Sequence, residues 1–257
     1  MKNIVHRRLE GIEVLTLTRP PANALDIETT EELADAFEAL YPDDLADDAA
    51  AAAVLTGDGK AFCAGLDLKA ISNYSQAELR RLLDAINRMA TAVYGCPIPV
   101  IGAINGHAIA GGFVLAMCCD WKIVADAPMQ VGLTEVRVGV PYPAAALEVV
   151  RSELHPQVAR ELVLFGKNMN AAEALAAGIF DESVALDQLP VRAMEKAREA
   201  AALPRHSFKV IKHQLRARAL EACRAAVSGE GEPLRDGWID PADARGTSSV
   251  LSRPRGR

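Results

Sequence analysis

The sequence is poor in the features that mark secreted, membrane-spanning and metal-binding proteins. Its five cysteines, an odd number, lie in no CxxC or other ligand spacing, which favours reduced thiols over a disulfide framework. The five histidines are scattered, so no metal site is expected. The opening MKNIVHRRLEG lacks the apolar segment of a secretory signal, and the longest apolar run, residues 109–119, is too short to span a bilayer. These absences predict a cytoplasmic protein with no membrane partner.

Basic residues are also fewer than acidic ones, with 28 lysines and arginines against 34 aspartates and glutamates. The net charge is −6 and the isoelectric point is near 5.5, which argues against a nucleic-acid partner. Hydrophobic residues make up 50% and charged residues 24%, as is ordinary for globular proteins. A chain of 257 residues can bury a sizeable core, as one large domain or two small ones.

What the sequence does contain is a glycine loop at its centre, NGHAIAGGFVLAMCCD (residues 105–120). The preceding PVIGAI is short and apolar, which predicts a buried strand, and the apolar run that follows predicts a helix. A strand, a glycine loop and a helix together direct bare backbone N–H groups toward a bound anion. Taken alone, the same segment is equally compatible with a tight packing turn.

A second glycine loop, KAFCAGLDLK (residues 60–69), follows the strand-like AAVLTG (residues 52–57). Two such loops, each offering one backbone N–H group, are what a two-donor oxyanion hole requires.

Four motifs, spread in order over most of the chain, carry a resemblance to a known family. They are RPPANALD (residues 19–26), KAFCAGLDL, GAINGHAIAGG and NAAEALAAGIFDE (residues 170–182). Together they resemble the enoyl-CoA hydratase/isomerase (crotonase) superfamily. The resemblance implies an α/β fold of the ClpP/crotonase type, a spiral of ββα units over residues 1–195. It also implies a helical C-terminal region and tail, residues 196–257, that mediates homotrimers, which are often paired into hexamers.

The other elements follow from hydrophobic spacing and turn signals. Residues 5–9 and 12–18 flank Glu10-Gly11 and predict a hairpin. Residues 75–94 predict a long amphipathic helix that ends at Gly95. Asn170 and Glu173 form a capping pair. Further strands are expected at residues 121–125 and 129–131, further helices from Thr29 or Thr30 and at 143–154, 157–165, 170–178, 190–203 and 204–227, a polar break at 43–48 and a mobile end at 252–257.

The resemblance also assigns the chemistry, which acts on an acyl-CoA thioester and needs no separate cofactor. The backbone N–H groups of Leu66 and Gly111 become the oxyanion donors that stabilise an enolate. Family hydratases carry two glutamates, but here the first position is Val114 and only the second, Glu135, is retained. Apolar neighbours of Glu135 predict a raised pKa. A single glutamate suits a proton moved between carbons, and GLTEVRVGV resembles the Δ3,Δ2-enoyl-CoA isomerase branch.

Recognition of CoA is less clearly encoded. The resemblance assigns Ala64, Asp67 and Leu68 to CoA through backbone contacts, Gly112 to the substrate, and a C-terminal lysine to the CoA phosphates. Lys212 fits this last role best and Lys209 is the second choice, although helix spacing alone favours solvated lysines.

Three alternatives follow from the same residues. A hydratase remains open if an unrecognised second acid/base exists, because VPYPAAALEVV (residues 140–150) departs from the hydratase pattern. In that segment Tyr142 and Glu148 are candidates for pocket residues, although packing is the favoured role for Tyr142 and a surface position is favoured for Glu148. Loss of the first glutamate is also compatible with a non-catalytic CoA-binding scaffold. A serine hydrolase is disfavoured, because no serine occurs between Ser75 and Ser152.

Overall fold

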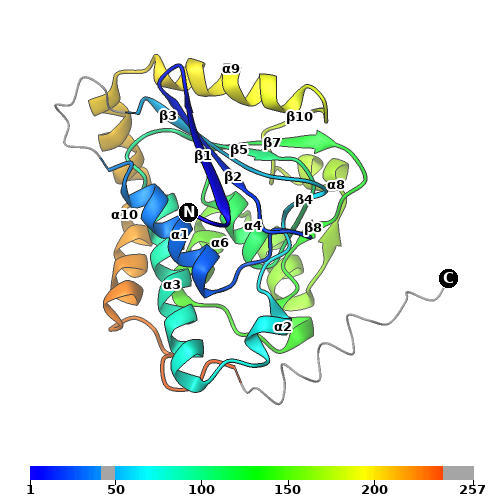
Figure 1. Ribbon diagram of the computed structural model, residues 1–257, viewed down its shortest axis with the longest axis vertical. Coiled ribbons are helices and arrows are strands. Elements are labelled where there is room, and N and C mark those ends of the chain that lie inside the picture. The colour runs from blue at the N-terminus through cyan, green and yellow to red at the C-terminus, as the bar shows by residue number, and fades with distance from the viewer. Residues whose placement is uncertain (42–49, 240–257) are drawn as a thin grey trace.

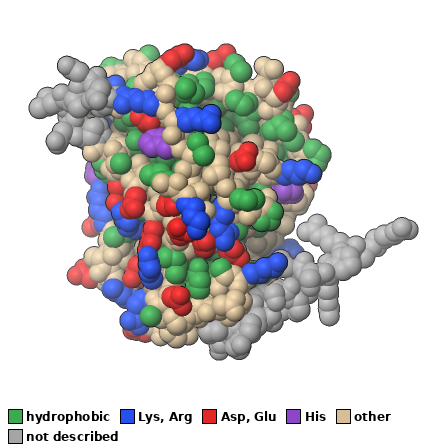
Figure 2. All heavy atoms as spheres, in the orientation of Figure 1, with side chains coloured by type: hydrophobic (Ala, Val, Ile, Leu, Met, Phe, Trp, Pro, Cys, Tyr) green, Lys and Arg blue, Asp and Glu red, His purple; other side chains and the backbone are tan. Residues whose placement is uncertain are grey.

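The computed structural model describes residues 1–41 and 50–239. The predicted polar break at 43–48 and the predicted mobile end at 252–257 lie outside the described residues. Within the described part of the chain, no helix is long and apolar enough to cross a membrane. Figure 2 shows acidic and basic side chains interspersed over one face rather than gathered by sign.

A large sheet of six strands forms the centre of the molecule, in the order β1-β2-β3-β5-β7-β10. The hairpin of β1 and β2 is antiparallel, and every later pairing in this sheet is parallel. The predicted hairpin is confirmed, and its turn places Glu10 and Gly11 at φ 54° and 78°, the left-handed values that suit a two-residue hairpin. The strands are β1 (Ile4–Leu9), β2 (Ile12–Leu17), β3 (Ala52–Gly57), β5 (Val100–Ile104), β7 (Trp121–Asp126) and β10 (Glu182–Ala185).

A smaller sheet contains β4 (Ala61–Cys63), β6 (His107–Ile109), β8 (Val131–Gly132) and β9 (Asn168–Met169). In it β4, β6 and β8 are parallel neighbours, while β9 is antiparallel to β8. Three times the chain passes through a strand of the large sheet, then a strand of the small sheet, then a helix. This is the expected ββα spiral. The strand predicted at 129–131 begins only at Val131.

Helices cover both sides of the large sheet (Figure 1). On one side α9 (Leu189–Ala201) packs on β3, β5 and β7. On the other side α1 (Ile27–Glu38), α3 (Gln76–Tyr94), α6 (Ala144–Glu153) and α10 (Arg205–Ser228) pack on one another. The boundary predicted between residues 195 and 196 falls inside α9. Shorter elements are α2 (Leu68–Ile71), α4 (Gly111–Met117), α5 (Glu135–Val138), α7 (Pro156–Ala159), the π-helical turn η1 (Arg160–Leu164) and α8 (Ala171–Ala176).

Side-chain caps explain where several helices begin. Ser75 with Glu78 forms a complete capping box at α3, and Asn170 with Glu173 forms one at α8, as predicted for the second pair. The start of α1 was predicted too late, because the side chain of Asp26 accepts the Thr29 N–H group at 2.8 Å and the helix begins at Ile27.

The helix predicted at 157–165 is confirmed in position, because α7 continues without a break into η1, but its second part is a π-helical turn and not α-helix. The wider turn of η1 buries Leu162 and leaves Leu164 and Phe165 exposed. Hydrophobic spacing alone does not separate this arrangement from a continuous α-helix.

Candidate active site

The three predicted catalytic positions follow three neighbouring strands of the small sheet. Leu66 comes shortly after β4, Gly111 after β6 and Glu135 after β8. These strands are parallel and adjacent, so their carboxyl ends meet at one edge of the sheet, where α/β proteins commonly bind ligands. All three residues line one cavity of about 450 Å³. The structure therefore brings together residues that are far apart in the sequence.

Leu66 is held so that its own N–H group is free. It forms a parallel bridge with Leu25. The Leu25 N–H group donates to Gly65 O at 2.7 Å, and the Asp67 N–H group donates to Leu25 O at 2.9 Å. Because the Gly65 carbonyl and the Asp67 N–H group both point toward Leu25, the Leu66 N–H group between them points away from Leu25. Among the described residues it has no acceptor.

Gly111 supplies the second free donor. It is the first residue of α4, where the helix leaves its leading N–H groups without internal partners. Ala110, just before it, has the strained angles φ 52° and ψ −125°, and its N–H group is fixed on Gly132 O at 2.8 Å. The Gly111 N–H group itself has no acceptor in the described parts of the chain.

A glycine lets the two donor loops touch. Gly65 has φ 80°, and a Cβ atom there would lie 2.6 Å from Ile109 O and 3.2 Å from Gly111 N. Only a residue without a side chain permits this approach. The two free N–H groups therefore lie on loops in direct contact, as a two-donor oxyanion hole requires.

Glu135 provides an acid/base group in the same cavity. Its side chain is buried, with a relative exposure of 6%. The Tyr142 hydroxyl donates to its Oε2 atom at 2.8 Å. Burial raises the pKa of Glu135 to about 7, although hydrogen bonds from its own backbone, from Tyr142 and from Thr134 oppose the rise. At neutral pH both protonation states are populated, which suits a group that takes up and returns a proton.

The other carboxylate that lines the cavity is already engaged. Asp67 Oδ2 accepts Arg19 at 2.7 Å, and its Oδ1 atom accepts the N–H groups of Lys69 and Ala70 at 3.1 Å. Partial burial acts to raise the pKa of Asp67, but the hydrogen bonds from Arg19 and α2 outweigh it and lower the pKa. Asp67 thus anchors the first donor loop rather than exchanging protons.

The remaining cavity wall is mostly apolar. Val114, at the position where family hydratases carry their first glutamate, is 2% exposed and lines the cavity. A valine can neither hold a water molecule by a hydrogen bond nor exchange a proton. The other apolar lining residues include Ile86, Met89, Val138, Val140, Ala146 and Trp238.

The predicted CoA contacts are only partly brought together. Ala64, Asp67 and Leu68 line the cavity. However, the N–H groups of Ala64 and Asp67 already donate to Ala22 O and Leu25 O, so these two donors are not available to a ligand. Gly112 does not line the cavity. A Cβ atom on it would lie 2.0 Å from Cys63 O, so its role is to let α4 pack closely against β4.

Lys212 is not brought to this cavity. It is buried, and its Nζ atom lies 2.6 Å from Asp120 Oδ2 and 3.3 Å from Ile98 O. Arg216 pairs with the other oxygen of Asp120 at 3.0 Å. Asp120, which follows the end of α4, also accepts the Val100 N–H group of β5 at 2.7 Å. Within one chain, Lys212 fixes α10 to the core.

Four lining residues were missed or misjudged from the sequence. Tyr142 was a candidate pocket residue for which packing was favoured, but it contacts Glu135 because Gly139, at φ 66°, turns the chain back after α5. Arg19 opens the motif RPPANALD, but nothing in that motif predicted that it would pair with Asp67. Lys69 is exposed and has no charged partner among the described residues. Trp238 comes from the C-terminal tail, where no periodicity marked it.

Comparison with known proteins decides the family. Residues 7–235 match the sequence model of the enoyl-CoA hydratase/isomerase family. The chain belongs to this family. It is 33% identical over 203 residues to a probable enoyl-CoA hydratase, echA17, of Mycobacterium avium, covering 79% of this chain and 77% of the relative. It is 29% identical over 208 residues to the human mitochondrial enoyl-CoA delta isomerase 1, covering 80% and 68%.

Solved structures of this family have the same fold. The crystal structure of human mitochondrial Δ3-Δ2-enoyl-CoA isomerase superposes with a TM-score of 0.85 at 25% identity and covers 99% of this chain and 100% of that one. An enoyl-CoA isomerase of Mycobacterium tuberculosis gives a TM-score of 0.79 at 31% identity, covering 90% and 98%. The predicted crotonase fold is confirmed. Crotonase enzymes act on acyl-CoA substrates, and the relatives include both isomerases and hydratases.

Proposed function

We propose that this family member is an enoyl-CoA isomerase that moves a double bond of an acyl-CoA thioester from C3 to C2. One observation carries the proposal: among the described residues that line the cavity, Glu135 is the only carboxylate not engaged by a cation. Moving one proton between two carbons needs one acid/base group, whereas family hydratases use two glutamates to add water.

The thioester oxygen would lie at the free N–H groups of Leu66 and Gly111. As Glu135 takes the C2 proton, negative charge develops on this oxygen, and each donor contributes about 3 kcal/mol to stabilising it. Glu135 then returns the proton at C4, and the double bond finishes between C2 and C3. The electrons and the proton balance without water or a cofactor.

Tyr142 would fix which oxygen of Glu135 reacts. Its hydroxyl occupies Oε2, so Oε1 is left to face the substrate. Burial and the negative charge of Glu135 raise the pKa of Tyr142, so the phenol stays protonated and remains a donor. The position where family hydratases carry their first glutamate is held by Val114, which supports proton transfer over hydration.

CoA itself would enter at the polar side of the cavity. Lys69 is the exposed cation there and offers its charge to the CoA phosphates. We propose no cofactor beyond the CoA of the substrate. We also propose a cytoplasmic homotrimer or hexamer, as the family resemblance implies.

The test is a pair of assays on the purified protein, one following conversion of 3-enoyl-CoA to 2-enoyl-CoA and the other following water addition to 2-enoyl-CoA. We expect isomerisation without hydration, and a loss of at least ~100-fold in kcat for Glu135→Gln. The matched control is Glu230→Gln at an exposed glutamate, which should turn over like the wild type. Brisk hydration would replace the proposal with a hydratase. Thioester binding without turnover would indicate a CoA-binding scaffold.

A further inference from the structure

A second cavity shares one lining residue, a tryptophan, with the candidate active site. The second cavity, of about 440 Å³, is lined by Leu79, Leu83 and other residues from the first half of α3. Ile86 and Met89, further along the same helix, line the active-site cavity. Residues three and four apart share one helix face, so the two cavities follow one another along α3. Trp238 lines both.

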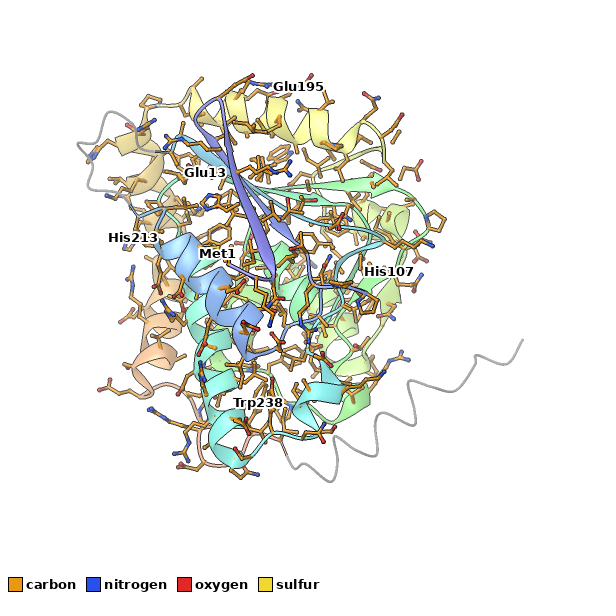
Figure 3. The ribbon with its side chains drawn as sticks, viewed as in Figure 1. Met1, Glu13, His107, Glu195, His213 and Trp238 are labelled. Atoms are coloured by element: carbon orange, nitrogen blue, oxygen red, sulfur yellow. The ribbon has the colours of Figure 1, made fainter. Side chains whose placement is uncertain are left out.

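Trp238 is firmly held in this position, beside α2 and α3 (Figure 3). Its exposure is 5%, and its indole N–H group donates to Pro141 O at 2.7 Å. Pro141 lines the active-site cavity and directly precedes Tyr142, the residue that contacts Glu135. The hydrogen bond thus joins the C-terminal segment to the loop that shapes the site.

A buried clamp holds the segment that carries Trp238. Glu232 is 4% exposed and accepts hydrogen bonds from Asn87 Nδ2 at 2.7 Å and from the Ala144 N–H group at 2.8 Å. Asn87 Oδ1 in turn accepts the Ala145 N–H group at 3.0 Å. The segment after α10 is therefore fixed to α3 and to the start of α6. A side chain anchored in this way can act as a wall, because it does not swing aside without breaking buried hydrogen bonds.

We infer that Trp238 is the end wall of the acyl site and sets the upper limit on acyl-chain length. The inference rests on the proposed function, in which the apolar part of the cavity holds the acyl chain. Ile86 and Met89 from α3, Ala146 from α6 and Trp238 together supply apolar lining against which an acyl chain can pack. Behind the wall, Leu79, Leu83 and Ile239 offer further apolar surface to a longer chain. Without Trp238 the two cavities would join along α3.

The experiment measures chain-length dependence by two readouts. One is kcat/KM for a series of 3-enoyl-CoA thioesters of increasing acyl length. The other is calorimetric binding of saturated acyl-CoA thioesters of the same lengths, which requires no chemistry. For Trp238→Ala we expect the preferred length to move to longer chains, with a gain of at least ~10-fold for long relative to short substrates. Trp238→Phe, which keeps most of the ring, should shift the preference less.

Arg80→Ala is the matched control. Arg80 lines the second cavity at its exposed side, where it contacts Arg235 O and Asp236, and its removal leaves the buried hydrogen bonds of Trp238 and Glu232 in place. We expect its chain-length preference to match the wild type. Trp238→Leu is the second variant if Trp238→Ala fails to fold, since it retains apolar bulk and still shortens the wall.

The outcomes separate the two proposals. Isomerisation with an unchanged chain-length profile in folded Trp238 variants would overturn the wall and leave the isomerase intact. Tighter binding of long acyl-CoA without turnover on any thioester would support the wall and overturn the isomerase. A shift of both binding and turnover to longer chains would support both.

Discussion

The Tyr142 hydroxyl donates a hydrogen bond of 2.8 Å to Glu135 Oε2, although the two residues lie on opposite sides of a tight turn after α5. The contact gives a fixed orientation to Glu135, the only carboxylate among the described cavity residues that is not engaged by a cation. It also stabilises the ionised form of that carboxylate, because a hydrogen bond donated to a carboxylate favours its charge. Burial pushes the pKa of Glu135 up and Tyr142 pushes it down, and the balance is about 7.

Tyr142→Phe should therefore raise the pKa of Glu135. A hydrogen bond to a charged group contributes about 1.5–3 kcal/mol, which corresponds to a rise of roughly one to two pH units. Since Glu135 must be ionised to take a proton, the acidic limb of the kcat/KM profile should move to higher pH. Activity at pH 7 should fall ~10-fold and recover in alkali.

Tyr41→Phe is the control for this change. Tyr41 donates a comparable hydrogen bond of 3.0 Å to Ala92 O and does not line the active-site cavity. Its pH profile should match the wild type. If Tyr142→Phe lowered activity equally at every pH, Tyr142 would act only by packing.

Gly65→Ala should disrupt the oxyanion hole. The new Cβ atom would lie 2.6 Å from Ile109 O and force the two donor loops apart. Misplacing one donor costs ~10²–10³-fold in kcat. Left-handed backbone at a non-glycine residue adds about 1–2 kcal/mol of destabilisation.

Gly59→Ala separates these two effects. Gly59 has a similar φ of 75°, but a Cβ atom there meets nothing within 4 Å. This variant should lose comparable stability to backbone strain and keep its activity, as thermal unfolding and initial rates would show. Equal losses of activity in both variants would argue against the contact between the donor loops.

Local signals explain why much of the fold could be predicted from the sequence. Ser75 and Glu78 define the start of α3 because a capping box needs residues only three positions apart. The hairpin turn at Glu10-Gly11 is local in the same way. Glycine spacing alone left the central loop equally compatible with a packing turn. The resemblance to the family identified the two loops as carriers of the oxyanion donors Leu66 and Gly111.

The features that the sequence did not reveal depend on tertiary contacts. Helix spacing favours a solvated position for Lys212, whereas in the structure Lys212 pairs with Asp120, 92 residues away. Trp238 bonds to Pro141 across 97 residues. Neither partner lies within the range of helix or strand periodicity, so no local pattern could predict these contacts.

Two lysines offer a direct test of where CoA binds. Lys69→Met removes the exposed cation at the cavity and should raise KM for the thioester about threefold, as expected for a solvent-exposed charge contact worth 0.5–1 kcal/mol. Its thermal stability should not change. Lys212→Met instead leaves buried Asp120 with one cation fewer and should cost several kcal/mol of stability.

The KM of Lys212→Met should stay at the wild-type value if this lysine serves only to anchor α10. A raised KM with unchanged stability would show that Lys212 reaches CoA bound to a neighbouring copy of the chain. Thermal unfolding and steady-state kinetics on both variants distinguish these results.

Val114→Glu should introduce water addition. The new carboxylate would share the cavity wall with Glu135 and supply the second acid/base group that hydration uses. We expect hydration of 2-enoyl-CoA at least ~10-fold above that of Val114→Gln, which can hold water but cannot exchange a proton. Both substitutions bury a polar group at a site that is 2% exposed and should cost about 1–3 kcal/mol. Equal hydration by the two variants would mean that Val114 does not decide the reaction.

Glu135 should also make the protein less stable as pH rises. Its pKa is raised by burial from 4.5 to about 7 in the folded state, so between these values the folded protein holds the proton that the unfolded chain has lost. The contribution of Glu135 is fully present below pH 4.5 and is lost as pH passes 7, a fall of roughly 3 kcal/mol. Urea unfolding at pH 5 and pH 8, at fixed protein concentration, should show most of this fall in the wild type and in Glu230→Gln. Glu135→Gln, which cannot ionise, should lack most of it and be the more stable protein at pH 8. The same fall in all three proteins would contradict a buried, ionisable Glu135.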